Sequence, residues 1–192
     1  MSTGTETTAA AAGLRGVVAA QSSIGDVNGE EGILIYQGYD IHDLAEHSTF
    51  EEVVFLLWNG RLPSQAELDE HTARLRRNYE APKQVIELLR QYPKSSNPMD
   101  VLRTAVSSLD LYDSKGQGTD RESAVGAAVR ITGQIGTIVA AWDRIRNGNE
   151  PVAPDHNLSI AENFLYMLRG KKADADEARM FDIALILHAD HE

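Results

Sequence analysis

Two histidines and two acidic residues stand together at the end of the sequence. Residues 184–192 read Ala-Leu-Ile-Leu-His-Ala-Asp-His-Glu, so an apolar stretch leads directly into His188, Asp190, His191 and Glu192. Desolvation and mutual charge suit such groups to holding an anionic substrate. One interpretation is therefore anion binding at an apolar-walled cleft, with His191 donating to a carboxylate of the ligand. The simpler alternative is a polar helix end facing solvent, or a histidine satisfied in the core.

A metal site is a further hypothesis for the same residues. His188 and His191 are three residues apart and share a helix face if the helix continues. However, zinc sites need three or four ligands, the spacing is not His-Glu-x-x-His, and the sequence contains no cysteine. We therefore expect no metal site here.

Composition and charge exclude several classes of partner. Of 192 residues, 42% are hydrophobic and 24% are charged, which is typical of a soluble globular protein. The net charge of −11 disfavours binding to nucleic acid or to an anionic membrane surface. We expect no apolar run that approaches the roughly 18 residues of a membrane span. We expect residues 1–12, rich in Thr and Ala and without signal-peptide features, to form a flexible tail.

The elements that must position the histidines are predicted to be mostly helical. A small β-hairpin is expected first, with strands at 14–20 and 33–36 and Asn28-Gly29 in the reversal between them. Beyond Gly38, helix signals replace strand signals. The pattern predicts helices near 40–46, 49–58, 64–78, 82–91, 98–112, 120–146, 159–169 and 174–189.

Capping residues set these helix boundaries. A Ser or Thr followed three residues later by Glu can satisfy two backbone amides reciprocally. Glycine after a helix permits a left-handed cap, as predicted at Gly60, Gly148 and Gly170. The predicted capping pairs are Ser48/Glu51, Ser64/Glu67, Thr119/Glu122, Ser159/Glu162 and, more loosely, Asp174/Glu177.

The expected helix 120–146 is unusual in its many small residues, Gly133 and Gly136 among them. An interior glycine costs a helix about 1 kcal/mol relative to alanine, so close approach of another helix is expected to offset it. That helix could belong to the same domain or to a second subunit. The residues alone leave both alternatives open.

Several motifs, taken in order, resemble those of citrate synthases of the bacterial and archaeal dimeric type. The resemblance spans nearly the whole chain, and the motifs contain chemically distinctive residues rather than general helix formers. They are 13–19 (GLRGVVA), 22–24 (SSI), 32–41 (GILIYQGYDI), 50–53 (FEEV), 60–63 (GRLP), 98–103 (PMDVLR) and 187–192 (LHADHE).

The resemblance implies an acyltransferase of the tricarboxylic acid cycle that condenses acetyl-CoA with oxaloacetate, in a mostly helical fold with a large and a small domain. His191 matches the family histidine that hydrogen-bonds oxaloacetate, and His188 matches a more variable neighbour. The helix 120–146 matches a helix at the interface of the family's homodimer. No cofactor is implied, because the coenzyme A thioester is a substrate, and a cytoplasmic location is expected. A related enzyme, 2-methylcitrate synthase, uses propionyl-CoA instead.

The sequence departs from the family in one respect. The catalytic Pro-Leu-His-Gly-Gly and Gly-His-Arg stretches of citrate synthases do not occur in it. We therefore expect the catalytic residues to lie beyond residue 192. Residues 13–192 are expected to form the N-terminal part of the large helical domain, with its remainder and the small domain absent. A non-catalytic dimerising fragment and an unrelated helical binding module are the competing hypotheses.

Overall fold

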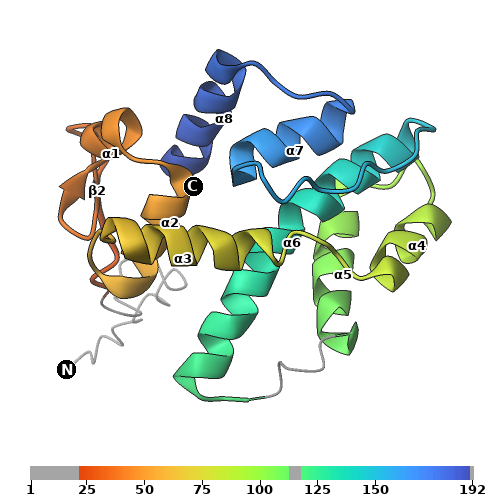
Figure 1. The fold of residues 1–192 in the computed structure, drawn as a ribbon, viewed down its shortest axis with the longest axis horizontal. Helices are drawn as coiled ribbons and strands as arrows, with labels where there is room; N and C mark the ends of the chain where they lie inside the picture. Colours follow the sequence, from red (N-terminus) through yellow and green to blue (C-terminus); the bar gives the residue numbers. More distant parts are fainter. Residues whose placement is uncertain (1–21, 113–117, 191–192) are drawn as a thin grey trace, which may run out of the picture.

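The computed structural model describes residues 22–112 and 118–190, and in these residues the fold is mostly helical, with a small sheet at its start (Figure 1). The predicted fold class is therefore confirmed. The strands are β1 (Gly25–Asn28), β2 (Ile33–Tyr36) and β3 (Tyr39–Asp40). The helices are α1 (Ile41–His47), α2 (Phe50–Asn59), α3 (Gln65–Arg76), α4 (Lys83–Gln91), α5 (Pro98–Leu109), the 3-10 turn η1 (Asp110–Tyr112), α6 (Arg121–Arg146), α7 (Ile160–Arg169) and α8 (Ala175–Leu187).

The sheet is antiparallel in the order β1-β2-β3, and it corrects one strand assignment. The partner of β2 is β1, with Gly25 opposite Tyr36 and Asn28 opposite Ile33. The first strand of the hairpin is therefore β1, and the predicted strand at 14–20 lies outside the described residues. The Gly-Asp-Val-Asn composition of β1 is poor in strand formers, so pairing with β2, rather than local preference, makes it a strand.

The helix starts confirm most of the predicted caps. Capping boxes join Ser64 to Glu67, Ser159 to Glu162 and Asp174 to Glu177. Gly60, Gly148 and Gly170 have the positive φ angles expected after a helix.

Two caps differ from the prediction. The box before α2 joins Thr49 to Glu52, because Ser48 closes the end of α1 instead. The cap of α6 is Asp120, whose carboxylate accepts from the backbone amide of Ser123 at 2.9 Å, and not Thr119. In both places two residues able to cap a helix are adjacent, and the second of the two is the N-cap of the helix.

The long helix α6 runs through the middle of the fold and contacts α3, α4, α5 and α7. Its buried residues Ile138, Ala141, Trp142 and Ile145 pack with α4 and α5 in one apolar core. At Gly133 an added Cβ atom would lie 2.6 Å from the carbonyl oxygen of Asn78, so this glycine is required by the close approach of the segment after α3. Internal packing therefore explains part of the small-residue pattern.

By length and composition alone, α6 contains an 18-residue stretch apolar enough to cross a membrane, which differs from the expectation of no such stretch. The stretch meets this criterion because it contains few charged residues, although polar residues interrupt it and no uninterrupted apolar run in it is long. The same two properties are met by core helices of soluble proteins, and four neighbouring helices contact α6.

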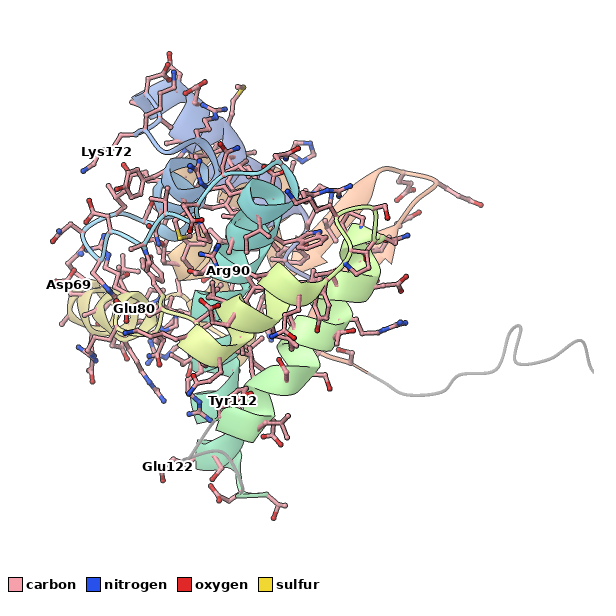
Figure 2. All side chains as sticks on the ribbon, turned by 90° about the vertical axis from the view of Figure 1, so that its right-hand side faces the viewer. Asp69, Glu80, Arg90, Tyr112, Glu122 and Lys172 are labelled. Carbon is pink, nitrogen blue, oxygen red and sulfur yellow. The ribbon has the colours of Figure 1, made fainter. Side chains whose placement is uncertain are left out.

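Ion pairs at the periphery connect segments that are distant in sequence. Arg90 of α4 (Figure 2) lies 2.6 Å from Glu150, which follows α6. Such an exposed pair contributes little stability by itself, but it marks where α4 meets the segment between α6 and α7.

A second apolar core lies at the end of the molecule that contains the sheet, and it positions α8. It joins the sheet, α1 and α2 to the last turn of α8, as Figure 1 shows on the side of the chain where the C-terminus lies. Its fully or nearly buried members are Tyr36, Ile41, Leu44, Val53, Leu56 and Ile186.

Candidate functional site

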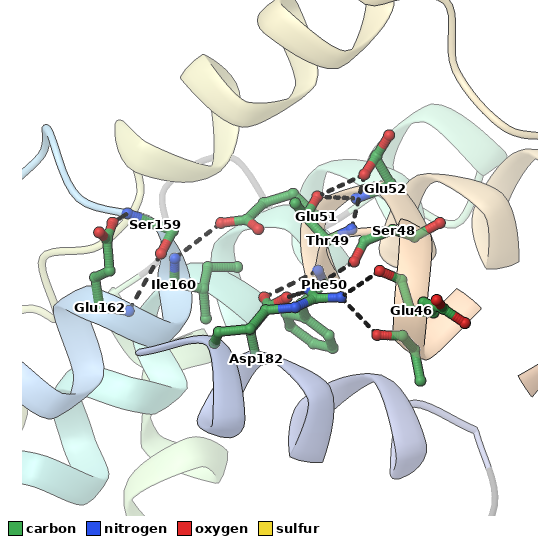
Figure 3. Close-up of polar contacts among 12 residues, drawn as sticks. Glu46, Ser48, Thr49, Phe50, Glu51, Glu52, Ser159, Ile160, Glu162 and Asp182 are labelled. Atoms are coloured by element: carbon green, nitrogen blue, oxygen red, sulfur yellow. Dashed lines mark hydrogen bonds and ion pairs between the residues drawn. The ribbon is translucent and has the colours of Figure 1, made fainter. Parts of the chain in front are cut away.

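Helix α8 carries the predicted site residue His188, and polar contacts fix the helix against α1 and α2 (Figure 3). Its buried residues Ala178, Asp182 and Ile186 are four apart and form one stripe that faces the fold. The guanidinium of Arg179 donates to three carbonyl oxygens at the end of α1, those of Ala45, Glu46 and Ser48, at 2.5–3.1 Å. These carbonyls have no partner within their helix, so Arg179 acts as a cap supplied by another helix.

Two buried carboxylates complete this connection. Asp182 accepts from the backbone amide of Phe50 at 3.0 Å and from Arg179 at 2.8 Å, so it caps the start of α2. Glu51, 3% exposed, accepts from the amide of Ile160 at 2.8 Å and so caps the start of α7. Burial raises the pKa of both carboxyl groups, and the amide hydrogen bonds oppose that shift. The starts of α2 and α7 are thereby held by side chains from neighbouring helices.

His188 is the residue at which α8 ends, and it is exposed. Its Nδ1 atom lies 2.7 Å from the carbonyl oxygen of Ala184. Because a carbonyl oxygen only accepts, Nδ1 carries the proton and donates, and Nε2 is the nitrogen that remains to contact a ligand. The structure thus places His188 exposed at the end of α8, and its role as a substrate ligand stays a prediction. His191, the stronger candidate from the sequence, lies outside the described residues, so its place beside His188 stays a prediction.

The described residues contain no group of three His, Cys, Asp or Glu side chains arranged to hold a metal ion. His191 lies outside the described residues, so the expectation of no metal site stays a prediction as well.

The structure also reveals a buried histidine that the sequence patterns did not single out. His71 of α3 is 9% exposed, and its ring meets those of Phe55 and Trp58 edge-on, with centroids 5.5 and 5.6 Å away. Its Nε2 atom has no hydrogen-bond partner among the described residues. Burial, followed by repulsion from Arg74, lowers the pKa of His71 to about 4. The residues around His71 are mostly polar, as on a solvent-facing helix, so the sequence alone did not indicate that His71 is buried.

An apolar groove of about 400 Å³ lies where α6, α7 and α8 meet. Gly136 and Phe164 line it, and a Cβ atom at Gly136 would be 3.7 Å from the Phe164 ring, in ordinary contact. Ile131 and Ile135, on the same stretch of α6, are 40% and 38% exposed. Both glycines line this groove, but an added Cβ atom fits at Gly136 and not at Gly133.

Comparison with known proteins connects this arrangement to one family. The family model described as "Citrate synthase, C-terminal domain" matches residues 13–192. Citrate synthase 2 of Bacillus subtilis is 44% identical over 181 residues, and 2-methylcitrate synthase 1 of Corynebacterium glutamicum is 39% identical over 186 residues. These alignments cover 94% and 93% of this chain and 48% of each relative, so the chain spans about half the length of the curated relatives it matches.

Solved structures agree with the sequence matches. The chain superposes on citrate synthase from Pyrobaculum aerophilum with a TM-score of 0.87 at 38% identity, covering 94% of this chain and 47% of that one. It also superposes on citrate synthase from Thermoplasma acidophilum, described as a ternary complex with carboxymethyl coenzyme A and oxaloacetate, with a TM-score of 0.86 at 28% identity. That alignment covers 92% of this chain and 46% of the other.

Proposed function

Because this chain belongs to the citrate synthase family, we propose that the protein condenses acetyl-CoA with oxaloacetate and water to form citrate and coenzyme A. The match of the family model to residues 13–192 carries this proposal. We propose this activity for a protein as long as the full-length relatives, and not for residues 1–192 alone. Propionyl-CoA is the alternative acyl donor, since one relative is a 2-methylcitrate synthase, but the first relatives by identity are citrate synthases.

The end of α8 is proposed to contact oxaloacetate. The similar Thermoplasma protein was crystallised with oxaloacetate and a coenzyme A derivative. In this chain His188 ends α8, with Nδ1 committed to Ala184 and Nε2 remaining for a ligand. His191 follows three residues later. Because Nδ1 donates to Ala184, Nε2 of His188 can donate to a carboxylate or keto oxygen of the substrate only in the imidazolium form, whereas a neutral His191 can donate from whichever ring nitrogen carries its proton.

The reaction also needs groups that we assign outside this chain. Enolising acetyl-CoA requires a base at its methyl group and hydrogen-bond donors to the thioester oxygen. We propose that the half of the relatives' length not spanned here carries them. The described part of this chain contributes the scaffold that holds the substrate-contacting end of α8.

The proposal includes a homodimer in the cytoplasm, formed through α6, with no role for nucleic acid or membrane. The exposed Ile131 and Ile135 and the groove beside Gly136 support an interface on this helix.

The test uses the protein expressed from its complete gene, supplied with acetyl-CoA and oxaloacetate while thiol release is followed. His191→Ala should lower kcat/KM for oxaloacetate by an amount equivalent to about 1–3 kcal/mol, the range expected for one lost substrate hydrogen bond. His188→Ala should cost less. A wild-type protein that releases no thiol with either acetyl-CoA or propionyl-CoA would contradict the proposed function. A His191→Ala variant with wild-type kinetics, beside an impaired His188→Ala variant, would show that the roles of the two histidines are reversed.

A further inference from the structure

The side-chain hydroxyl of Tyr36 contacts the end of α8 from the opposite end of the chain. Tyr36 belongs to β2 and is fully buried. Its hydroxyl donates to the carbonyl oxygen of Leu187 at 3.4 Å and accepts from the backbone amide of Asp190 at 3.4 Å. These two groups flank His188 and Ala189, so one hydroxyl spans the turn that contains His188.

Backbone hydrogen bonds and the Tyr36 hydroxyl both hold this turn. The last carbonyls of a helix lack partners within it. Here His188 and Ala189 donate backward to Leu185 and Ile186 at 3.3 and 3.2 Å. The carbonyl oxygen of Leu187 accepts a side-chain hydrogen bond from Tyr36, 151 positions away.

The ring and the hydroxyl of Tyr36 have separate roles. The ring packs in the core with Ile41, Leu44 and Ile186, and Ala189 lies against the same cluster. The hydroxyl is the part that reaches the backbone after Ile186. A change that removes the oxygen and keeps the ring therefore leaves the core filled and frees the turn.

We propose that Tyr36 is a positioning residue, whose hydroxyl fixes the turn Leu187–Asp190 and with it the imidazole of His188. The link between this turn and oxaloacetate rests on the proposed function. The link between Tyr36 and the turn does not, because it follows from the two hydrogen bonds alone. Tyr36 touches no substrate in this role, since it acts through the backbone.

The same fold provides a matched control. Tyr79 is also buried, at 1% exposure, and its hydroxyl donates to the carbonyl oxygen of Leu158 at 3.2 Å. Tyr79→Phe therefore deletes the same kind of buried hydroxyl and the same kind of hydrogen bond, but at the segment before α7. A general loss of stability should appear in both variants, whereas a change at the end of α8 should appear in Tyr36→Phe alone.

The experiment compares Tyr36→Phe, Tyr79→Phe and wild type, each expressed from the complete gene. The first readout is amide hydrogen exchange at Asp190, which does not depend on any activity. Exchange should be faster in Tyr36→Phe by about fivefold, the ratio equivalent to one ordinary hydrogen bond, and unchanged in Tyr79→Phe. Equal exchange at Asp190 in Tyr36→Phe and wild type would overturn the proposal.

The second readout is the split between KM and kcat for oxaloacetate. Tyr36→Phe should raise KM by about fivefold with kcat retained, because a displaced imidazole weakens substrate binding. Partial unfolding would instead lower apparent kcat at constant KM, because fewer molecules would be active. Faster exchange with an unchanged KM would overturn the link between Tyr36 and oxaloacetate binding. The proposed function would still be tested separately by His191→Ala. A wild type without activity would refute the proposed function, and the exchange result would still decide the role of Tyr36.

Discussion

At the scale of single residues, the fold repeatedly uses a polar side chain from one element to complete the backbone of another. Arg179 completes the end of α1, Asp182 the start of α2 and Glu51 the start of α7. An uncompensated backbone group in such a place costs about 1–3 kcal/mol. His71 is one exception, because its buried Nε2 atom has no hydrogen-bond partner among the described residues.

The buried state of His71 has a consequence for acid stability. Its pKa falls from an ordinary 6.5 to about 4 in the folded protein. Between these values the unfolded chain binds a proton that the folded chain excludes, so the free energy of unfolding decreases as pH falls through this window. The contribution is complete above the upper value, and its total is on the order of 3 kcal/mol.

We expect His71→Phe to lose less stability than wild type between about pH 7 and about pH 4.5. Urea unfolding at both pH values measures the difference. His47→Gln is the control, because His47 is largely exposed and should leave the pH dependence as in wild type. If His71→Phe retained the full wild-type pH dependence, His71 would not be held neutral by burial.

At the scale of elements, the junction between α1 and α2 depends on which of two adjacent residues is the cap. Thr49→Ala should lower the free energy of unfolding by about 1 kcal/mol, because the Thr49 hydroxyl serves the start of α2. Ser48→Ala should cost clearly less, since Ser48 contributes its backbone carbonyl to Arg179. Parallel urea titrations of the two variants decide between them, and a larger cost for Ser48→Ala would contradict the cap assignment.

The same junction explains what the sequence could and could not predict. All eight described helices were predicted within a few residues, because capping pairs and glycines are local signals. Ser48/Glu51 and Thr49/Glu52 fit the capping pattern equally well, however, and Glu51 is taken by a contact with Ile160, 109 positions away. No local pattern contains that contact. The strand Gly25–Asn28 was missed for the same reason, because its partner strand determines it.

Helix α6 separates two roles of glycine that look alike in the sequence. Gly133 faces the backbone of Asn78 inside the fold, and Gly136 faces the apolar groove. Gly136→Leu should therefore weaken the proposed dimer, since overpacking an interface typically costs about 1–3 kcal/mol. Sedimentation of the protein from the complete gene measures its association.

Gly133→Ala provides the contrast for this experiment. Its added Cβ atom would meet the Asn78 carbonyl at 2.6 Å, so it should lower the melting temperature of the chain itself. An unaltered dimer in Gly136→Leu would place the interface elsewhere than on this part of α6.

At the scale of the whole molecule, the described residues form a scaffold around the end of α8, and the proposed reaction needs more than that. We expect residues 1–192 alone to show no citrate-forming activity with acetyl-CoA and oxaloacetate. Thiol release is the measurement, and the protein from the complete gene is the positive control. Turnover by residues 1–192 near ordinary enzyme values of about 1–1,000 per second would show that the base lies within this chain.

The site was predictable from the sequence only in part. The residue types at 188 and 191 indicated a ligand-binding helix end; the structure places His188 exposed at the end of α8, and its role as a ligand stays a prediction. The contribution of Tyr36 was not predictable, because it stands in an ordinary strand pattern and meets α8 only through the folded core.

The cap that Arg179 places on α1 also bears on how the chain matures during translation. The carbonyl oxygens of Ala45 and Glu46 precede Arg179 by 134 and 133 positions. At about 5–20 residues per second, a ribosome takes roughly 7–27 s to make that stretch. For this interval the nascent sheet, α1 and α2 lack the helix that covers them, and their apolar surface is open to chaperones. Protease treatment of ribosome-arrested chains should cut near α1 when synthesis stops before α8, and equal protection with and without α8 would show that this end of the molecule forms without it.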